Sequence, residues 1–438
     1  MKTTQLKAKF VDIKKSEFIR NVFTVATGTA IAQALAMAFA PVITRLYGPE
    51  AYGAFGVFTS IVGILTPVVA LAYPIAIVLP KNDADARALI RLSLYVAATI
   101  SIVALFVFVL FSQPVVHFLQ IESVRQYLIL IPFIMFFAAG AQVAQQWLIR
   151  KRQFRVRARI DVLQELVINV TKTGAGFINP VATVLIVVTA LGQALQALLL
   201  IQGASKVVEQ EIQQGTDKNS HQSNLYRLAK RYYDFPLYRA PQIFANGVAQ
   251  SLPVLMLSAF FGPAAAGFYG IGRIVLAVPS QFIGRSVGDV FYPRIAEASN
   301  NNEKLTPLIL ETTFGLAAIG LVPFGIVIVF GPWLFGFVFG ADWVTAGEYA
   351  RWLALWLYFA FCNIPSVNAL PVLSAQLFNL VFELFSIILR VSALALGSYV
   401  FESDVIAIAL FGISGAIINI MLILITVIKS SHRDRGYE

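Results

Sequence analysis

The chain has 438 residues, of which 58% are hydrophobic and only 13% charged, and its formal net charge is +10. Soluble domains carry about 25% charged residues, so this composition and the mean hydropathy of +0.75 exclude a string of soluble domains and indicate a bilayer protein. Because the basic residues cluster between apolar segments, we interpret the positive charge as a signal of membrane topology and not as a nucleic-acid-binding surface.

The apolar segments predict a multi-pass helical bundle. Residues 1–20 are basic and polar, lack the short apolar core and cleavage site of a signal peptide, and are expected to be a cytoplasmic lead-in. A span needs about 20 apolar residues, and about twelve segments qualify. The predicted spans are 21–43, 53–79, 88–111, 126–149, 160–178, 181–202, 238–260, 265–291, 308–330, 349–370, 376–399 and 405–428.

The longest polar stretch divides the chain into two lobes of six spans. Residues 203–233 include the run Gln-Gln-Gly-Thr-Asp-Lys-Asn-Ser-His and read as a flexible linker. We therefore expect an N-terminal six-helix lobe over residues 1–202, a cytoplasmic linker over 203–237 and a C-terminal six-helix lobe over 238–438. The fold class is an all-α integral membrane protein.

The two lobes repeat one pattern. Tyr47-Gly-Pro-Glu-Ala-Tyr-Gly-Ala-Phe-Gly56 and Phe261-Gly-Pro-Ala-Ala-Ala-Gly-Phe-Tyr-Gly270 share the frame aromatic-Gly-Pro-x-Ala-x-Gly-x-x-Gly. Three further matches follow at nearly constant offset: Pro67 with Pro279, Glu165 with Glu383, and Lys172 with Arg390. Six spans per lobe is an even number, so the pattern predicts a parallel repeat about an axis along the membrane normal.

The distribution of Lys and Arg predicts the orientation. Residues 150–159 alone contain six basic side chains, and the other basic clusters fall in loops on the same side, whereas the opposite loops are short and carry mostly acids. Basic loops stay in the cytoplasm, so both termini are expected there. Short outer loops leave no room for an extracytoplasmic catalytic domain.

Charged residues inside the predicted spans are the candidate site. Asp161, Glu165, Asn169, Lys172 and Gly176 recur at steps of three or four and share one face of the fifth span. A charge at mid-bilayer costs about 2.5–3.5 kcal/mol. Two turns place Glu165 and Lys172 about 10 Å apart along the axis, too far to pair tightly. They are expected to face other helices or a wet cavity, and a purely structural interhelical ion pair is the alternative.

The eighth and eleventh spans carry further charges. Arg285 and Asp289 are spaced for an i,i+4 pair near the inner end of the eighth span. Arg273 lies nearer the outer half without a local acid, which suits an anionic ligand, although a snorkelling arginine would look the same. Glu383 and Arg390 are the only charges in the eleventh span, and Arg45 ends the first.

No pattern indicates catalysis or a cofactor. The chain lacks a Gly-x-Ser-x-Gly motif, and Gly262-x-x-x-x-Gly267 lacks the Lys-Ser/Thr of a phosphate loop. The single cysteine, Cys362, excludes an intrachain disulfide, and no Cys/His cluster indicates a metal. We therefore expect a transporter, not an enzyme, without metal or cofactor, driven by an ion gradient, the membrane potential or substrate supply.

Several segments together resemble a known family. Ala32-Gln33 before the first glycine frame, Tyr73-Pro-Ile-Ala-Ile-Val-Leu-Pro80, Arg150-Lys-Arg-Gln-Phe154 and Tyr233-Asp-Phe-Pro-Leu-Tyr-Arg-Ala-Pro241 are similar to the polysaccharide (O-antigen and capsule repeat unit) flippases. These belong to the multidrug/oligosaccharidyl-lipid/polysaccharide exporter superfamily. The resemblance covers most of the chain and does not identify the sugar.

The resemblance implies a fold, a substrate and partners. Such proteins form two six-helix lobes around a central cavity and move undecaprenyl-pyrophosphate-linked oligosaccharide to the outer leaflet of the bacterial cytoplasmic membrane. A polysaccharide polymerase and a chain-length regulator are the implied protein partners, and no nucleic acid is. The expected cavity cations are Lys172, Arg273, Arg285, Arg390 and Arg45, and the expected cavity or coupling acids are Glu165, Glu383 and Asp289.

Three other functions share parts of this pattern. A multidrug exporter of the same superfamily would carry organic cations, which the many basic intramembrane residues disfavour. A membrane-embedded polysaccharide polymerase or ligase would need a sizeable outer loop. A peptidoglycan-precursor flippase differs only in cargo. Within the first interpretation, Glu165 and Glu383 either carry a coupling proton or only neutralise nearby cations, and Glu→Gln variants separate these two roles.

Overall fold

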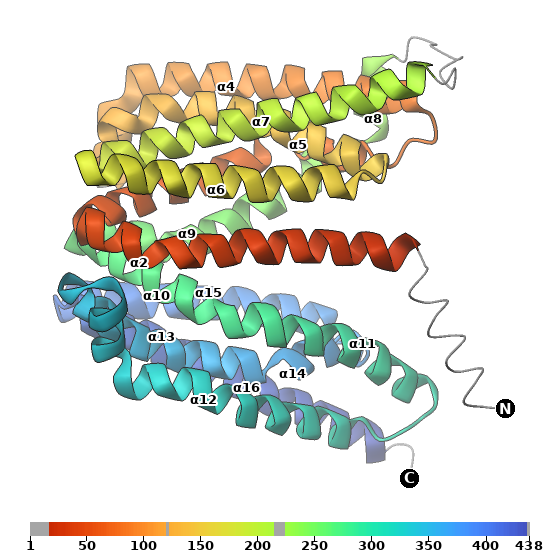
Figure 1. The fold of residues 1–438 in the computed structure, drawn as a ribbon. Coiled ribbons are helices and arrows are strands. Elements are labelled where there is room, and N and C mark those ends of the chain that lie inside the picture. The colour runs from red at the N-terminus through yellow and green to blue at the C-terminus, as the bar shows by residue number, and fades with distance from the viewer. Residues whose placement is uncertain (1–16, 120–121, 214–223, 436–438) are drawn as a thin grey trace. The chain divides into compact units, whose positions relative to one another are not determined.

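The computed structural model describes residues 17–119, 122–213 and 224–435, and every regular element within them is helical (Figure 1). The elements in chain order are α2 Glu17–Leu65, η1 Thr66–Val68, α3 Tyr73–Ala76, α4 Asp83–Leu119, η2 Glu122–Leu130, α5 Ile131–Arg150, α6 Phe154–Ile178, α7 Ala182–Gln213, α8 Leu225–Arg231, η3 Phe235–Arg239, α9 Ala240–Phe261, α10 Pro263–Pro279, η4 Ser280–Gly284, α11 Arg285–Asn300, α12 Leu305–Phe339, η5 Ala341–Trp343, α13 Val344–Cys362, α14 Ile364–Ala369, α15 Gln376–Val400 and α16 Asp404–Arg435. The predicted all-α fold is confirmed. The basic lead-in before residue 17 lies outside the described residues.

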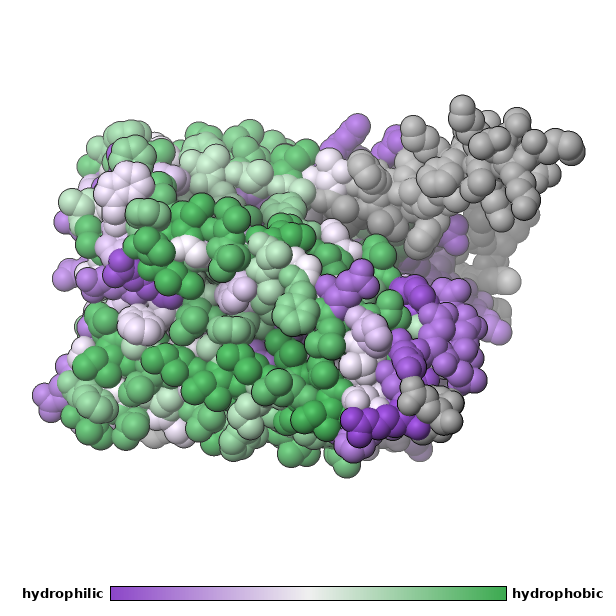
Figure 2. All heavy atoms as spheres, turned by 90° about the horizontal axis from the view of Figure 1, so that it is seen from below, coloured by the Kyte–Doolittle hydropathy of each residue, from purple (hydrophilic) through white to green (hydrophobic). Residues whose placement is uncertain are grey.

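Each of the twelve predicted spans contains helix, but the second is interrupted between η1 and α3 and the tenth between α13 and α14. Nine helical segments of the described chain are long and apolar enough to cross a bilayer by length and composition. One of them, Thr27–Val68, contains most of the first predicted span and residues 53–68 of the second in a single kinked helix. The fifth and tenth predicted spans lie on α6 and α13, outside those nine. Hydrophobic residues cover the middle of the face drawn in Figure 2, and hydrophilic ones gather toward its ends.

The described helices pack into two compact units. The N-terminal unit contains the described residues up to Tyr47 together with Val57–Ser251, and the C-terminal unit contains Gly48–Gly56 together with the described part of Leu252–Glu438. The lobes at 1–202 and 238–438 stay a prediction. The predicted linker is partly helical, because α7 continues to Gln213 and α8 forms after it; residues 214–223 lie outside the described part.

The first glycine of each repeat frame breaks a helix. Gly48 has φ 69° inside α2, and Gly262 has φ 86° between α9 and α10. This left-handed region is accessible to glycine without a steric cost. The proline that follows each glycine suits the first turn of the next helix, where a missing backbone N–H costs nothing. The Gly-Pro pair therefore lets the chain change direction between two consecutive spans.

The second glycine of each frame lets the two frames touch. A Cβ added at Gly53 would overlap the carbonyl oxygen of Pro263. A Cβ added at Gly267 would lie 2.7 Å from the carbonyl oxygen of Pro49 and 3.1 Å from the backbone nitrogen of Gly53. All four residues belong to the C-terminal unit. Both backbones approach so closely that only glycine fits at these two positions.

The repeated prolines that follow the two frames, Pro67 and Pro279, also interrupt regular helix. Pro67 lies in the short η1, and the chain then passes through Leu71 and Ala72, both with positive φ, before α3. Pro279 is followed by the π-helical turn η4. Proline removes one backbone donor and clashes with the preceding turn, so both interruptions follow from the residue type.

Candidate functional site

In the N-terminal unit, the predicted polar face of α6 carries an ordered carboxylate. Glu165 is half-buried, and the buried Asn169 amide donates to its Oε1 at 2.8 Å and to its backbone carbonyl at the same distance. Lys172, one turn further along, is also half-buried. An amide that fixes the acid orients one oxygen and leaves the other available to a cation.

Tyr47 of the first repeat frame anchors this face. Its hydroxyl donates to the backbone carbonyl of Lys172 at 2.7 Å. Its ring fills a notch at Gly176, where an added Cβ would lie 2.7 Å from the ring Cε2. The sequence marked Tyr47 only as the aromatic residue of a repeated frame, and the structure adds a long-range role: Tyr47 holds α2 against α6 beside Lys172.

In the C-terminal unit, Arg390 is enclosed by aromatic rings. Its guanidinium lies 4.8 Å from the centroid of Trp356 on α13 and 5.8 Å from that of Phe411 on α16. Nε also donates to the Ser386 carbonyl at 3.3 Å, and the side chain is only 15% exposed. Stacking on aromatic faces stabilises a guanidinium that is withdrawn from water. Arg390 is therefore held in place chiefly by rings, which leaves part of its N–H edge uncommitted.

The acid two turns before Arg390 reaches it, but loosely. Glu383 Oε1 lies 3.8 Å from Arg390 Nη2, and the Glu383 side chain is 63% exposed. The same seven-residue spacing between Glu165 and Lys172 is expected to be too long for tight pairing. A long arginine on a helix leans toward the N-terminus, and this lean closes the gap in α15. The contact is longer than a charge-assisted hydrogen bond, which measures about 2.7–2.9 Å.

Arg273 approaches the same place from α10. Tyr269, 1% exposed, interacts electrostatically with both Arg273 and Arg390. Arg273 lies ten residues after Pro263, and Arg390 ten residues before Val400, about 15 Å along each helix. The ring centroids of Phe260, near the end of α9, and Tyr399, near the end of α15, lie 4.8 Å apart. Helix α10 begins two residues after α9 ends, so its start lies near the end of α15. The backbones at Arg273 and Arg390 therefore lie at a similar distance from this end of the unit, and the two side chains interact electrostatically.

The remaining predicted residues are not gathered into either cluster. Arg285 and Asp289 are both exposed, and no ion pair joins them in the described part of the chain. Arg45 is exposed near the kink of α2. The structure thus brings together Arg273, Arg390 and Glu383 in one unit and orders Glu165 near Lys172 in the other.

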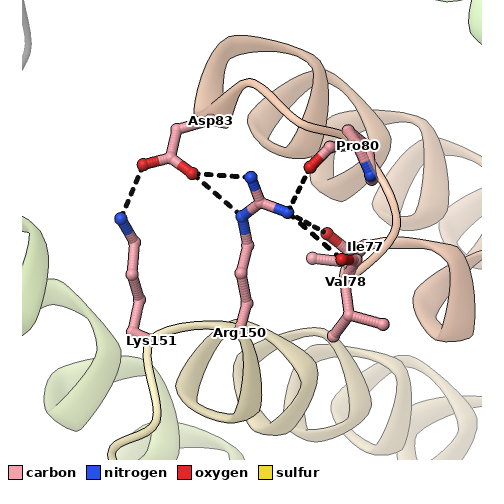
Figure 3. Close-up of polar contacts among 6 residues, drawn as sticks. All are labelled: Ile77, Val78, Pro80, Asp83, Arg150 and Lys151. Carbon is pink, nitrogen blue, oxygen red and sulfur yellow. Dashed lines mark hydrogen bonds and ion pairs between the residues drawn. The ribbon is translucent and has the colours of Figure 1, made fainter.

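A third polar cluster, in the N-terminal unit, joins Asp83 to Arg150 and Lys151, which the sequence marked as topology signals and as part of the family resemblance (Figure 3). Arg150, at the end of α5, binds Asp83 Oδ1 through Nε at 2.9 Å and Nη2 at 2.8 Å. Its Nη1 donates to the carbonyls of Ile77, Val78 and Pro80 at 3.2, 3.4 and 2.7 Å. Lys151 binds the other carboxylate oxygen at 2.6 Å. We call Asp83, Arg150 and Lys151 the inner staple.

The inner staple satisfies a broken stretch of backbone. Between η1 and α4 the chain is irregular, and carbonyls without helical partners need donors. Helix α5 supplies them at both ends of the break: Gln142 Nε2 donates to the Thr66 carbonyl at 2.8 Å, and Arg150 covers the carbonyls near Asp83. With 11% of its side chain exposed, Arg150 is a structural residue and not a free surface cation.

Comparison with known proteins gives a family and one transporter relative. The sequence matches the model of a family described as polysaccharide biosynthesis protein over residues 42–348. The succinoglycan biosynthesis transport protein ExoT of Rhizobium meliloti (strain 1021) is 22% identical over 332 residues, which cover 72% of this chain and 61% of the relative. The chain therefore matches less than two thirds of that relative's length.

Solved structures show the same fold at low identity. An inward-facing multidrug resistance MATE family transporter of the MOP superfamily has a TM-score of 0.67 and 13% identity, covering 94% of this chain and 99% of that one. The lipid II flippase MurJ in an inward closed conformation has a TM-score of 0.65 and 12% identity, covering 94% and 90%. These likenesses concern the fold alone, and they fit the predicted bundle of about twelve spans in two lobes.

Proposed function

Because the chain belongs to the polysaccharide biosynthesis protein family, we propose that it is a flippase for lipid-linked oligosaccharide repeat units. The cargo is carried on undecaprenyl pyrophosphate and moves from the inner to the outer leaflet of the bacterial cytoplasmic membrane by alternating access. The product feeds lipopolysaccharide O-antigen or another surface polysaccharide. The chain acts as a transporter and not as an enzyme, next to a polymerase and a chain-length regulator.

The meeting of Arg273 and Arg390 supports this proposal most strongly. Intramembrane arginines are costly and tend to mark substrate pathways. A guanidinium presents N–H groups in a fork that matches phosphate oxygens. Two of them on α10 and α15, both interacting with Tyr269, suit an anionic lipid pyrophosphate better than an organic cation.

Removing either proposed substrate-binding cation is expected to stop transport. In a strain that lacks its own copy of this gene, Lys172→Ala and Arg390→Ala should lower surface polysaccharide by about a hundredfold, because loss of a desolvated charge contact costs roughly 2–5 kcal/mol. Lys172→Arg and Arg390→Lys should retain part of the function. Surface polysaccharide is measured by immunoblot, and membrane protein by an epitope tag.

The exposed Arg239, bonded to Gln242 in the same helical stretch, gives a matched control, since Arg239→Ala removes a cation outside the proposed site. Normal polysaccharide in both Lys172→Ala and Arg390→Ala would refute the binding role. If deletion of the gene left polysaccharide intact and made cells sensitive to organic cations, the protein would be a multidrug exporter instead.

The orientation proposed from the basic loops is tested by reporter fusions. A phosphatase or fluorescent reporter fused after Lys206, in the last part of α7, should behave as cytoplasmic. A reporter inserted near Asp342, in η5, should behave as extracytoplasmic. The physical reason is the excess of Lys and Arg in the loops on the first side. The reverse pattern would overturn the orientation and the cytoplasmic position of both termini.

A further inference from the structure

Arg390 and Glu383 differ sharply in how firmly they are held. Arg390 stacks on Trp356 and Phe411, and both rings are themselves packed: their centroids lie 5.3 Å apart with an edge-to-face geometry. Trp356 in turn lies against Gly415, where an added Cβ would be 2.7 Å from its Cγ. Glu383, by contrast, is mostly exposed. Arg390 is therefore held between two packed aromatic rings, and Glu383 is the partner that is free to move.

The contact between them is one that a better acceptor can replace. At 3.8 Å, Glu383 makes an ion pair with Arg390 and no hydrogen bond. A guanidinium paired in this way retains N–H groups that can donate two hydrogen bonds to a second anion. The neighbouring Arg273, which shares Tyr269 with Arg390, adds positive potential to the same point.

We propose that Glu383 is an internal counter-ion that keeps Arg390 neutralised in the empty protein and is displaced by a phosphate ester of the cargo. On release of the cargo, Glu383 returns to Arg390 and competes with rebinding. This proposal rests on the proposed function for the identity of the cargo. In this proposal Glu383 takes part in ligand exchange and does not change its protonation state.

The depth of Arg390 favours a lipid-linked cargo over a membrane phospholipid as the source of the phosphate. Arg390 lies about 15 Å along the helix from the end of α15, whereas phospholipid headgroups stay at the bilayer surface. Both ligands share the phosphate ester, so the experiment includes one of each. A saccharide carrier drawn into the bundle can bring its pyrophosphate to this depth.

The exchange predicts that removing the acid strengthens binding. In detergent-solubilised full-length protein, Glu383→Gln should bind inorganic pyrophosphate about fivefold more tightly than the wild type, as expected for loss of a competing ion pair. Arg390→Gln should bind it at least fivefold more weakly, and the double variant should show no gain over Arg390→Gln. Glu311→Gln, which removes another exposed acid from a spanning helix of the same unit, is the matched control and should equal the wild type.

Two further readouts separate this inference from the proposed function. Translocation of undecaprenyl-pyrophosphate-linked oligosaccharide by proteoliposomes tests the function, and pyrophosphate affinity tests the exchange. A wild type that translocates the lipid while Glu383→Gln shows unchanged or weaker affinity would refute the counter-ion role alone. A gain in Glu383→Gln without translocation by the wild type would refute the function alone. A gain for short-chain phosphatidylglycerol but not for the lipid-linked probe would overturn the assignment of the cargo as ligand.

Discussion

Gly53→Ala is expected to remove most of the folded protein from the membrane. The new Cβ would overlap the Pro263 carbonyl oxygen, and a backbone atom inside a helix end cannot swing aside as a side chain can. Overpacking of this kind costs about 3 kcal/mol or more. Gly267→Ala meets the Pro49 carbonyl at 2.7 Å and should be nearly as severe. Fluorescence-detected size-exclusion chromatography of tagged protein measures the monodisperse yield.

The same two frames supply the controls. Gly56 and Gly270 occupy the last position of each frame, and a Cβ added to either meets nothing within 4 Å. Alanine stabilises a helix by about 1 kcal/mol relative to glycine, so Gly56→Ala and Gly270→Ala should keep or raise the yield. If Gly53→Ala folded as well as Gly56→Ala, the close approach of the two frames would not exist in the membrane.

Arg150→Gln is expected to destabilise the N-terminal unit by about 3 kcal/mol, within the range for breaking a partly buried charge pair. The variant leaves Asp83 with Lys151 alone and withdraws the donor from the carbonyls of Ile77, Val78 and Pro80. Arg150→Lys should also destabilise the N-terminal unit, because one ammonium group cannot reach the Asp83 carboxylate and the backbone carbonyls together. Thermal unfolding in detergent, followed by loss of the monodisperse peak, measures the change.

Arg152 gives a nearby comparison. It lies two residues further on, in the turn after α5, and is exposed. Arg152→Gln removes one charge from the same basic run without touching the inner staple, so its unfolding temperature should match that of the wild type. Equal destabilisation of Arg150→Gln and Arg152→Gln would mean that only the net charge of the loop matters.

The helical spans and the repeat were predictable because both depend on local pattern. A run of about 20 apolar residues has one stable state in a bilayer, which is why every predicted span contains helix. Gly48 and Gly262 were recognisable as members of the repeat, whereas the helix break at each of them came from the structure. The polar face of α6 followed from a periodicity of three and four.

The contacts that make up the sites depend on tertiary packing and were therefore hidden. Nothing near Arg150 in the sequence distinguishes it from Arg152, and only the broken backbone 67 or more residues earlier makes it structural. The approach of Arg273 to Arg390 joins residues more than a hundred positions apart. The ion pair between Glu383 and Arg390 was not predicted, because an axial distance leaves out the reach and lean of an arginine side chain.

The contact between the two glycine frames obeys the pairing rule of a symmetric homodimer. Gly53 contacts Pro263, and Gly267 contacts Pro49. The glycine of each frame therefore contacts the proline of the other, which is the reciprocal pairing of an isologous interface. A substitution in one copy therefore alters a surface whose complement is the other copy of the same motif. A change that compensates for a substitution at either glycine is therefore to be sought four positions earlier in the opposite frame, at the proline that the glycine contacts.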